Sequence, residues 1–128
     1  MSSVTSALSD VAASLSPDEL TKKVDEIKAA GNERFLKGDY TQAKALYTDA
    51  LSLNPNIVAI YSNRAICELK LEQYGLAIAD ATKAIELDAT FAKAYFRRAC
   101  AHLAILDPKA ALPDLKICLL YTSPSPRD

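Results

Sequence analysis

The sequence predicts an all-α fold of three stacked helix-turn-helix repeats. Small residues recur at a constant separation of 34 positions, at Ala43, Ala77 and Ala111. Within each unit the apolar residues follow helical spacing, and no segment alternates with the period of two that a half-buried strand requires. A fixed period of this length indicates a stacked array, in which small residues occupy the places where helix backbones cross closely.

The first predicted helix begins at Pro17. Residues 1–16 are mostly Ser, Ala and Val without helical periodicity, so we predict a disordered lead-in there. Ser16 can cap a helix, Pro17 suits its first turn, and Glu19 completes a capping box. Ordered structure is therefore expected from residue 17 onward.

Turn residues divide the following chain into helices. Gly38 supplies a left-handed residue that ends the first helix, and Asp39 can cap the second. Asp107 and Pro108 provide a cap and a first-turn proline for the last helix. The predicted helices lie at about 17–37, 40–53, 57–71, 74–87, 90–105 and from 108 onward. They form repeats at about 24–57, 58–91 and 92–117 within one domain, 17–117.

The last eleven residues, 118–128, break the helical pattern of the third repeat. A natural Ser/Pro linker would have a similar composition. We favour a different interpretation, in which 118–128 is a translated transposase-adapter sequence, because the codons of such an adapter would encode this string. The third repeat is then truncated at 117, and the helix that normally caps the last apolar face of such an array is missing.

Composition and charge argue against several classes of function. The formal net charge of −1 gives no overall attraction to nucleic acid or to a membrane surface. One histidine, three scattered cysteines and three glycines provide neither a metal-ligand set nor a phosphate loop, so we expect no cofactor and no catalytic centre. No signal peptide, membrane span or disulfide spacing is evident, and we expect a monomer in the cytosol or nucleus.

Five polar side chains are predicted to converge on one groove. Lys28 and Asn32 are four residues apart on one predicted helix, as are Lys93 and Arg97 on another, so each pair points from one helix face. Asn63 lies 34 positions before Arg97, in the same repeat position. Single lysines and arginines are usually solvated surface charges, but Asn is unfavourable in helix interiors without a specific role. Three cations and two amides suit a ligand that carries two nearby carboxylates.

The repeat pattern resembles the tetratricopeptide repeat over about residues 18–117. The residues that carry this resemblance are Gly31, Gly38-Asp39-Tyr40, Ala43, Tyr47, Ala50 and Pro55. Lys28, Asn32, Asn63, Lys93 and Arg97 resemble, position for position, the dicarboxylate clamp with which domains of this family hold the acidic C-terminal tails of Hsp90 and Hsp70. The resemblance implies a protein-interaction module without catalysis of its own. Its expected affinity is micromolar, about −8 kcal/mol.

Residues 71–88 and 93–99 are similar to the N-terminal domain of the serine/threonine protein phosphatase 5 family. In that family the domain covers and inhibits a two-metal phosphatase domain until a chaperone tail draws it away. Departures from the family pattern occur at Ala81, Pro108 and Pro113, and Pro113 is expected to kink the last helix. The alternatives are the same module in a non-enzymatic co-chaperone adaptor or a peptidyl-prolyl isomerase, or a self-associating scaffold.

Overall fold

The structure is a computed structural model that describes residues 13–121. Over this range it contains helices and no strand, which confirms the predicted all-α class. The helices are α2 (Pro17–Leu36), α3 (Tyr40–Leu53), α4 (Val58–Lys70), α5 (Tyr74–Leu87), α6 (Ala92–Ala104) and α7 (Pro108–Tyr121). Residues 1–12 of the predicted lead-in and residues 122–128 of the predicted tail lie outside the described residues. Within the rest of the lead-in, Ala13 and Ser14 are helical.

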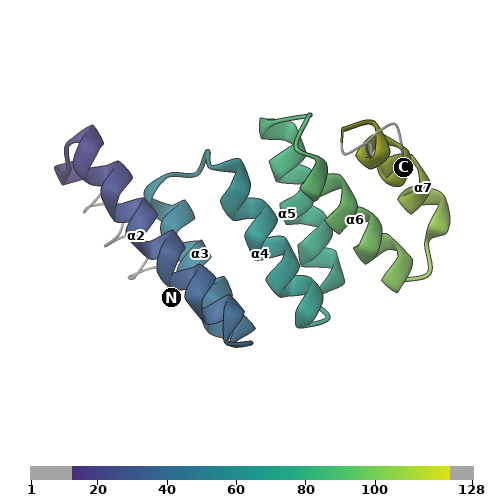
Figure 1. The fold of residues 1–128 in the computed structure, drawn as a ribbon, viewed down its shortest axis with the longest axis horizontal. Helices are drawn as coiled ribbons and strands as arrows, with labels where there is room; N and C mark the ends of the chain where they lie inside the picture. Colours follow the sequence, from purple (N-terminus) through teal and green to yellow (C-terminus); the bar gives the residue numbers. More distant parts are fainter. Residues whose placement is uncertain (1–12, 122–128) are drawn as a thin grey trace, which may run out of the picture.

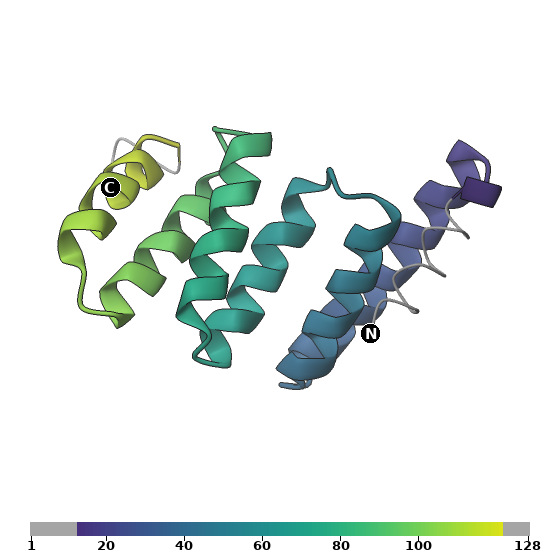
Figure 2. The ribbon, with the colours of Figure 1, turned by 180° about the vertical axis from the view of Figure 1, so that it is seen from behind.

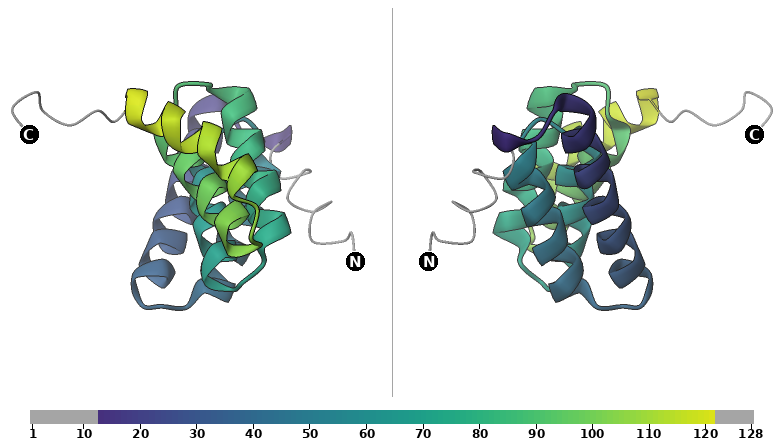
Figure 3. Two further views of the ribbon diagram at one scale, coloured as in Figure 1. Left: turned by 90° about the vertical axis from the view of Figure 1, so that its right-hand side faces the viewer. Right: turned by 90° about the vertical axis from the view of Figure 1, so that its left-hand side faces the viewer.

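The six helices form three antiparallel pairs that follow one another in sequence order. Figure 1 shows α2 and α3 at one end, α4 and α5 in the middle, and α6 and α7 at the other end. The reverse view in Figure 2 gives the same order, and the end views in Figure 3 show the pairs stacked behind one another. This arrangement confirms the predicted array of three repeats, in which each pair buries its apolar face against its neighbour.

The cap predicted at the start of α2 is present. The Glu19 backbone N–H donates to Ser16 Oγ at 3.2 Å, and the Ser16 backbone N–H donates to Glu19 Oε1 at 2.9 Å. Asp39 caps α3 in the predicted manner, because its Oδ1 accepts from the backbone N–H of Gln42 at 3.3 Å. These side chains satisfy backbone N–H groups that a helix start otherwise leaves without partners.

A left-handed residue ends the first helix of every repeat. The φ angles of Gly38, Glu72 and Leu106 are 79°, 60° and 63°, and these residues lie 34 positions apart. The residue that follows each of them donates its N–H back to a carbonyl near the end of the helix, at 2.8–2.9 Å. Only the first of these residues is a glycine. Residues with a Cβ atom rarely adopt a positive φ, so the geometry of the repeat imposes this conformation on Glu72 and Leu106.

Two buried ion pairs occupy equivalent places in the second and third repeats. Arg64 Nε and Nη2 donate to the two carboxylate oxygens of Asp80, both at 2.7 Å. Arg98 Nε and Nη2 donate in the same way to Asp114, both at 2.8 Å. Each arginine also reaches back to a threonine of the preceding helix pair, Thr48 or Thr82. The pairs therefore link the two helices within a repeat and join that repeat to the one before it.

The last helix continues past the predicted break at Cys118. Helix α7 contains 14 residues, as α3 and α5 do, and it remains helical across Pro113 and on to Tyr121. The predicted break at Cys118 is therefore not observed. The prediction of a non-native tail and a missing capping helix stays a prediction.

Glu68 is a buried carboxyl in the seam between the first two repeats. Its side chain is 3% exposed, Oε2 lies 3.4 Å from Lys44 Nζ, and Oε1 has no hydrogen-bond partner in the part of the chain that the structure describes. Burial raises the pKa of Glu68 well above its ordinary value, and the hydrogen bond with Asp80 and the charge of Asp80 raise it further, while Lys44 and Arg64 oppose the shift. The folded protein therefore holds a proton here that the unfolded chain releases near pH 4.5.

We expect the free energy of unfolding to fall as the pH rises from the ordinary glutamate value through neutral pH. The folded state binds more protons than the unfolded state in this window, so stability declines with pH. Urea unfolding at about pH 6 and about pH 9 measures this decline. Glu68→Gln, which removes the ionisation, should reduce the pH dependence and leave the protein more stable than the wild type at the higher pH. An unchanged slope in this variant would assign the pH dependence to another group.

Candidate functional site

The structure brings four of the five predicted site residues to two adjoining cavities. Asn32 on α2, Asn63 on α4 and Arg97 on α6 line a cavity of about 220 Å³, together with Tyr47 and Ile66. Lys93 and Arg97 line a second cavity of about 330 Å³, which also includes Ile66, Phe96 and Cys118. Arg97 and Ile66 belong to both cavities. We call the combined space, which runs across α2, α4 and α6, the groove.

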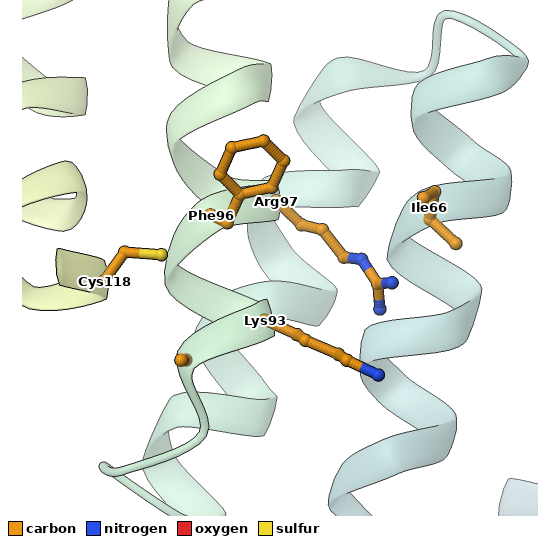
Figure 4. Close-up of a pocket in the computed structure, with 6 residues that line it drawn as sticks. Ile66, Lys93, Phe96, Arg97 and Cys118 are labelled. Atoms are coloured by element: carbon orange, nitrogen blue, oxygen red, sulfur yellow. The ribbon is translucent and has the colours of Figure 1, made fainter. Parts of the chain in front are cut away.

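The two cations of α6 point across the groove toward α4. Figure 4 shows Lys93 and Arg97 leaving α6 one turn apart, with their nitrogen atoms directed toward the helix that carries Ile66. Lys28 lies one turn before Asn32 on α2, and it is not among the residues that line the two cavities. That all five residues contact one ligand stays a prediction.

Arg97 is the central cation of the groove. Its Nη1 donates to the carbonyl oxygen of Ser62 at 2.9 Å and to Ser62 Oγ at 2.5 Å. Burial lowers the pKa of Arg97, since the half-buried guanidinium has lost part of its hydration. Unlike Arg64 and Arg98, it forms no ion pair with a carboxylate in the described part of the chain. A partly desolvated cation without a counterion favours the binding of an anion.

The two amides of the groove are connected to each other and to a buried phenol. Tyr47 Oη donates a short hydrogen bond to Asn32 Oδ1. The same oxygen accepts from Asn63 Nδ2 at 3.5 Å. With its carbonyl oxygen engaged from the protein side, Asn32 retains its two amide N–H donors for other partners.

The groups beneath the groove are neutral at physiological pH. Burial raises the pKa of Tyr47 to about 12, with a further increase from Cys67 and a partial decrease from Arg97. Burial likewise raises the pKa of the Cys67 thiol to about 11. Both groups therefore stay protonated and do not neutralise the positive charge of Arg97.

The described residues contain neither a metal-ligand cluster nor a membrane-spanning helix. No group of three His, Cys, Asp or Glu side chains between residues 13 and 121 could hold a metal ion, and no helix in that range is long and apolar enough to cross a membrane. Arg98, which follows Arg97 in the sequence, turns away to pair with Asp114. The two arginines therefore do not form a basic patch for nucleic acid.

Sequence reasoning missed two polar residues that contact the site from beneath. Tyr47 served only as part of the repeat pattern, and Ser62 received no role. Tyr47 is 1% exposed and Ser62 is fully buried. A serine in the interior of a helix is a weak signal in sequence, because its hydroxyl competes with helical backbone bonds unless it finds another partner. The partner of Ser62 lies 35 residues away on another helix, and the i, i+4 spacing within one helix does not predict such a contact.

The tetratricopeptide repeat family matches residues 29–57 and 58–91. The chain is 45% identical over 102 residues to serine/threonine-protein phosphatase T of Aspergillus oryzae, an alignment covering 80% of this chain and 21% of that protein. It is 41% identical over 97 residues to human serine/threonine-protein phosphatase 5, covering 76% and 19% respectively. The chain therefore spans about a fifth of the length of these phosphatases.

Two similar solved structures are chaperone-peptide complexes. The second tetratricopeptide domain of Spaghetti, bound to the HSP90 peptide SRMEEVD, gives a TM-score of 0.75 at 32% identity and covers 77% of this chain and 91% of that one. The TPR2B domain of yeast Sti1 in its pHsp70 complex gives a TM-score of 0.77 at 36% identity, with coverages of 80% and 82%. These similarities confirm the resemblance inferred from the repeat pattern.

Proposed function

This chain belongs to the tetratricopeptide repeat family, and from that membership we propose that it binds the acidic C-terminal tails of Hsp90- or Hsp70-type chaperones. The tail occupies the groove across α2, α4 and α6. Its terminal carboxylates contact a dicarboxylate clamp formed by Lys28, Asn32, Asn63, Lys93 and Arg97. The domain acts by binding and carries out no catalysis itself.

The observation that carries this proposal is that Arg97 is a partly buried cation without a carboxylate partner among the described residues. Arg64 and Arg98 each have an aspartate of this protein as counterion. Arg97 is half-buried, faces the groove and has only the neutral Ser62 as its protein partner among the described residues. A carboxylate from outside would supply the missing counterion. The second cavity, with Ile66 and Phe96 on its walls, offers apolar surface next to that cation.

A C-terminal aspartate matches the arrangement of donors. It carries an α-carboxylate and a side-chain carboxylate on one residue, while the groove offers Lys93 and Arg97 from α6 and the Asn32 amide from α2. Amide donors add hydrogen bonds without adding positive charge, which limits repulsion among the cations. Each hydrogen bond to a charged group contributes about 1.5–3 kcal/mol before the cost of ordering a flexible tail is subtracted.

Calorimetric titration of the 128-residue chain with the peptide Met-Glu-Glu-Val-Asp tests the proposal. We expect micromolar binding of the free acid, and a loss of about tenfold or more on C-terminal amidation or in Arg97→Ala, since each removes one side of a charge-assisted contact. Arg34→Ala is the matched control, because Arg34 is an exposed arginine on α2 that does not line the groove. Equal binding of the acid and the amide by folded protein would contradict the proposal.

We further propose that the domain is the regulatory part of a phosphatase 5-like enzyme. The identity to two such phosphatases supports this assignment over an adaptor or isomerase context. The coding sequence of the gene downstream of this domain tests it: a metal-dependent phosphatase domain would support the proposal, and an isomerase domain or further repeats would overturn it.

A further inference from the structure

We propose that Tyr47 and Ser62 are positioning residues for the groove. Tyr47 fixes the orientation of the Asn32 amide, and Ser62 fixes the guanidinium of Arg97, so that both present hydrogen-bond donors to the ligand. This inference rests on the proposed function of the groove. It assigns part of the discrimination between a carboxylate and an amide to two buried side chains that act through Asn32 and Arg97.

The orientation of the Asn32 amide follows from the partners of its oxygen. The pKa of Tyr47, raised to about 12, keeps its hydroxyl protonated and able to donate. That hydroxyl and Asn63 Nδ2 both bond to Asn32 Oδ1. Because an amide oxygen has two lone pairs, these partners occupy its acceptor capacity. A reversed amide would place an NH₂ group against the Asn63 donor and expose its oxygen to an incoming carboxylate.

Among residues 13–121, the guanidinium of Arg97 is held at one nitrogen only. Its Nη1 makes both bonds to Ser62, so Nη2 and Nε stay available for a carboxylate. Ser62 is fully buried on α4, and its position is set by the helix rather than by a mobile side chain. A long arginine side chain loses rotamer freedom when it binds a ligand. Because the contact with Ser62 already restricts Arg97 in the free protein, less rotamer entropy is lost on binding.

Neither polar side chain recurs at the equivalent position of the next repeat. In the second repeat, Ile66 stands at the position of Asn32 and Ala81 at that of Tyr47. Phe96 stands at the position of Ser62 in the third repeat. The α4–α5 pair forms without a tyrosine at the position of Tyr47, and the α6–α7 pair forms without a serine at the position of Ser62. Tyr47 occurs in the same repeat as Asn32, whose amide oxygen accepts its hydrogen bond.

The test compares Tyr47→Phe and Ser62→Ala with two control variants of the full 128-residue chain. Tyr61→Phe removes a partly buried hydroxyl that donates to the Pro55 carbonyl, and Ser52→Ala removes a more exposed hydroxyl that donates to the Thr48 carbonyl. Calorimetry with the free-acid and amidated Met-Glu-Glu-Val-Asp peptides gives the ratio of the two affinities for each variant. Urea unfolding separates losses of stability from losses of positioning.

We expect Tyr47→Phe and Ser62→Ala to weaken free-acid binding by about threefold to tenfold each, the effect of one hydrogen bond. The affinity for the amide should change less, so the ratio of acid to amide falls, whereas the controls keep the ratio of the wild type. An unchanged ratio in both variants, or an equal fall in the controls, would overturn the positioning role.

A measurement on the free protein keeps this inference separate from the proposed function. In ¹⁵N–¹H spectra, the side-chain amide signals of Asn32 should move in Tyr47→Phe, and the Nε–H signal of Arg97 should move in Ser62→Ala. Neither should move in Tyr61→Phe or Ser52→Ala. If the wild type binds neither peptide, the chaperone-tail proposal fails, and these spectra still decide whether Tyr47 and Ser62 fix the two donors. Unmoved signals would overturn the inference.

Discussion

Replacing Asp114 with alanine should lower the free energy of unfolding by about 3 kcal/mol, the effect of breaking a buried ion pair from one side. The Asp114 side chain is 5% exposed and accepts two hydrogen bonds from Arg98, which is itself 22% exposed. Its removal leaves a largely desolvated guanidinium without a counterion. Because Arg98 also contacts Thr82, the substitution weakens both the pairing of α6 with α7 and the seam to the second repeat.

The equivalent substitution in the second repeat, Asp80→Ala, should cost less. Arg64 loses the same bidentate partner, but the Glu68 carboxyl lies nearby and interacts with both Arg64 and Asp80. Without Asp80, the pKa of Glu68 falls, and the ionised Glu68 can replace part of the lost charge. His102 occupies the position of Glu68 in the third repeat and offers no such replacement.

Urea unfolding of the two single variants near neutral pH checks this difference. The double variant Asp80→Ala with Glu68→Gln removes the substitute carboxylate, and its loss should approach that of Asp114→Ala. Equal losses for Asp80→Ala and Asp114→Ala would show that Glu68 does not compensate. A negligible loss for Asp114→Ala would show that α7 is held by apolar contacts alone.

The sequence predicted the helices well because each end carries a local signal or a repeated one. Gly38 predicts a turn because glycine readily adopts a positive φ. The 34-residue period predicts the same turn at Glu72 and Leu106, although their side chains make a positive φ unfavourable. The break expected at Cys118 was wrong because α7 continues through this residue to Tyr121, with helical contacts that the likeness of 118–128 to an adapter sequence does not reveal. Tyr121, for example, lies against the ring of Tyr95 on α6.

The candidate site could be predicted only where it follows the spacing of residues on helices. The i, i+4 rule and the repeat period placed Asn32, Asn63, Lys93 and Arg97 on facing helices, and the structure brings them together. The contacts from Tyr47 and Ser62 depend on which rotamer each side chain adopts and on how closely two helices approach. Neither quantity is encoded in spacing.

Tyr47→Ala should lower the free energy of unfolding by about 4 kcal/mol, in the range for removal of a buried aromatic ring. Tyr47 is 1% exposed, belongs to the apolar core of the first two repeats, and lies where α2 and α3 cross. A Cβ atom added at Gly31 would lie 2.7 Å from Tyr47 Cε1, so the ring fills the space that a side chain at position 31 would need. The two residues therefore form one packing unit.

The same argument predicts that the effect of Gly31→Ala on the free energy of unfolding depends on the residue at position 47. In the wild type, the clash with a buried ring costs about 1–3 kcal/mol, which exceeds or matches the gain of about 1 kcal/mol in helix propensity. In the Tyr47→Ala background the clash is gone and the gain remains, so Gly31→Ala should stabilise the protein. The double variant then reproduces the pair Ala65 and Ala81, which are both fully buried at the equivalent crossing of α4 and α5.

A double-mutant cycle measured by urea unfolding decides whether this packing unit exists. The interaction energy should be about 1–3 kcal/mol, because contacting residues are not additive. Additive effects of Gly31→Ala and Tyr47→Ala would mean that the ring moves aside without cost. Gly38→Ala is a useful control: no atom lies within 4 Å of its added Cβ, and its φ of 79° predicts backbone strain that is independent of Tyr47. Its effect should therefore be the same with and without the tyrosine ring.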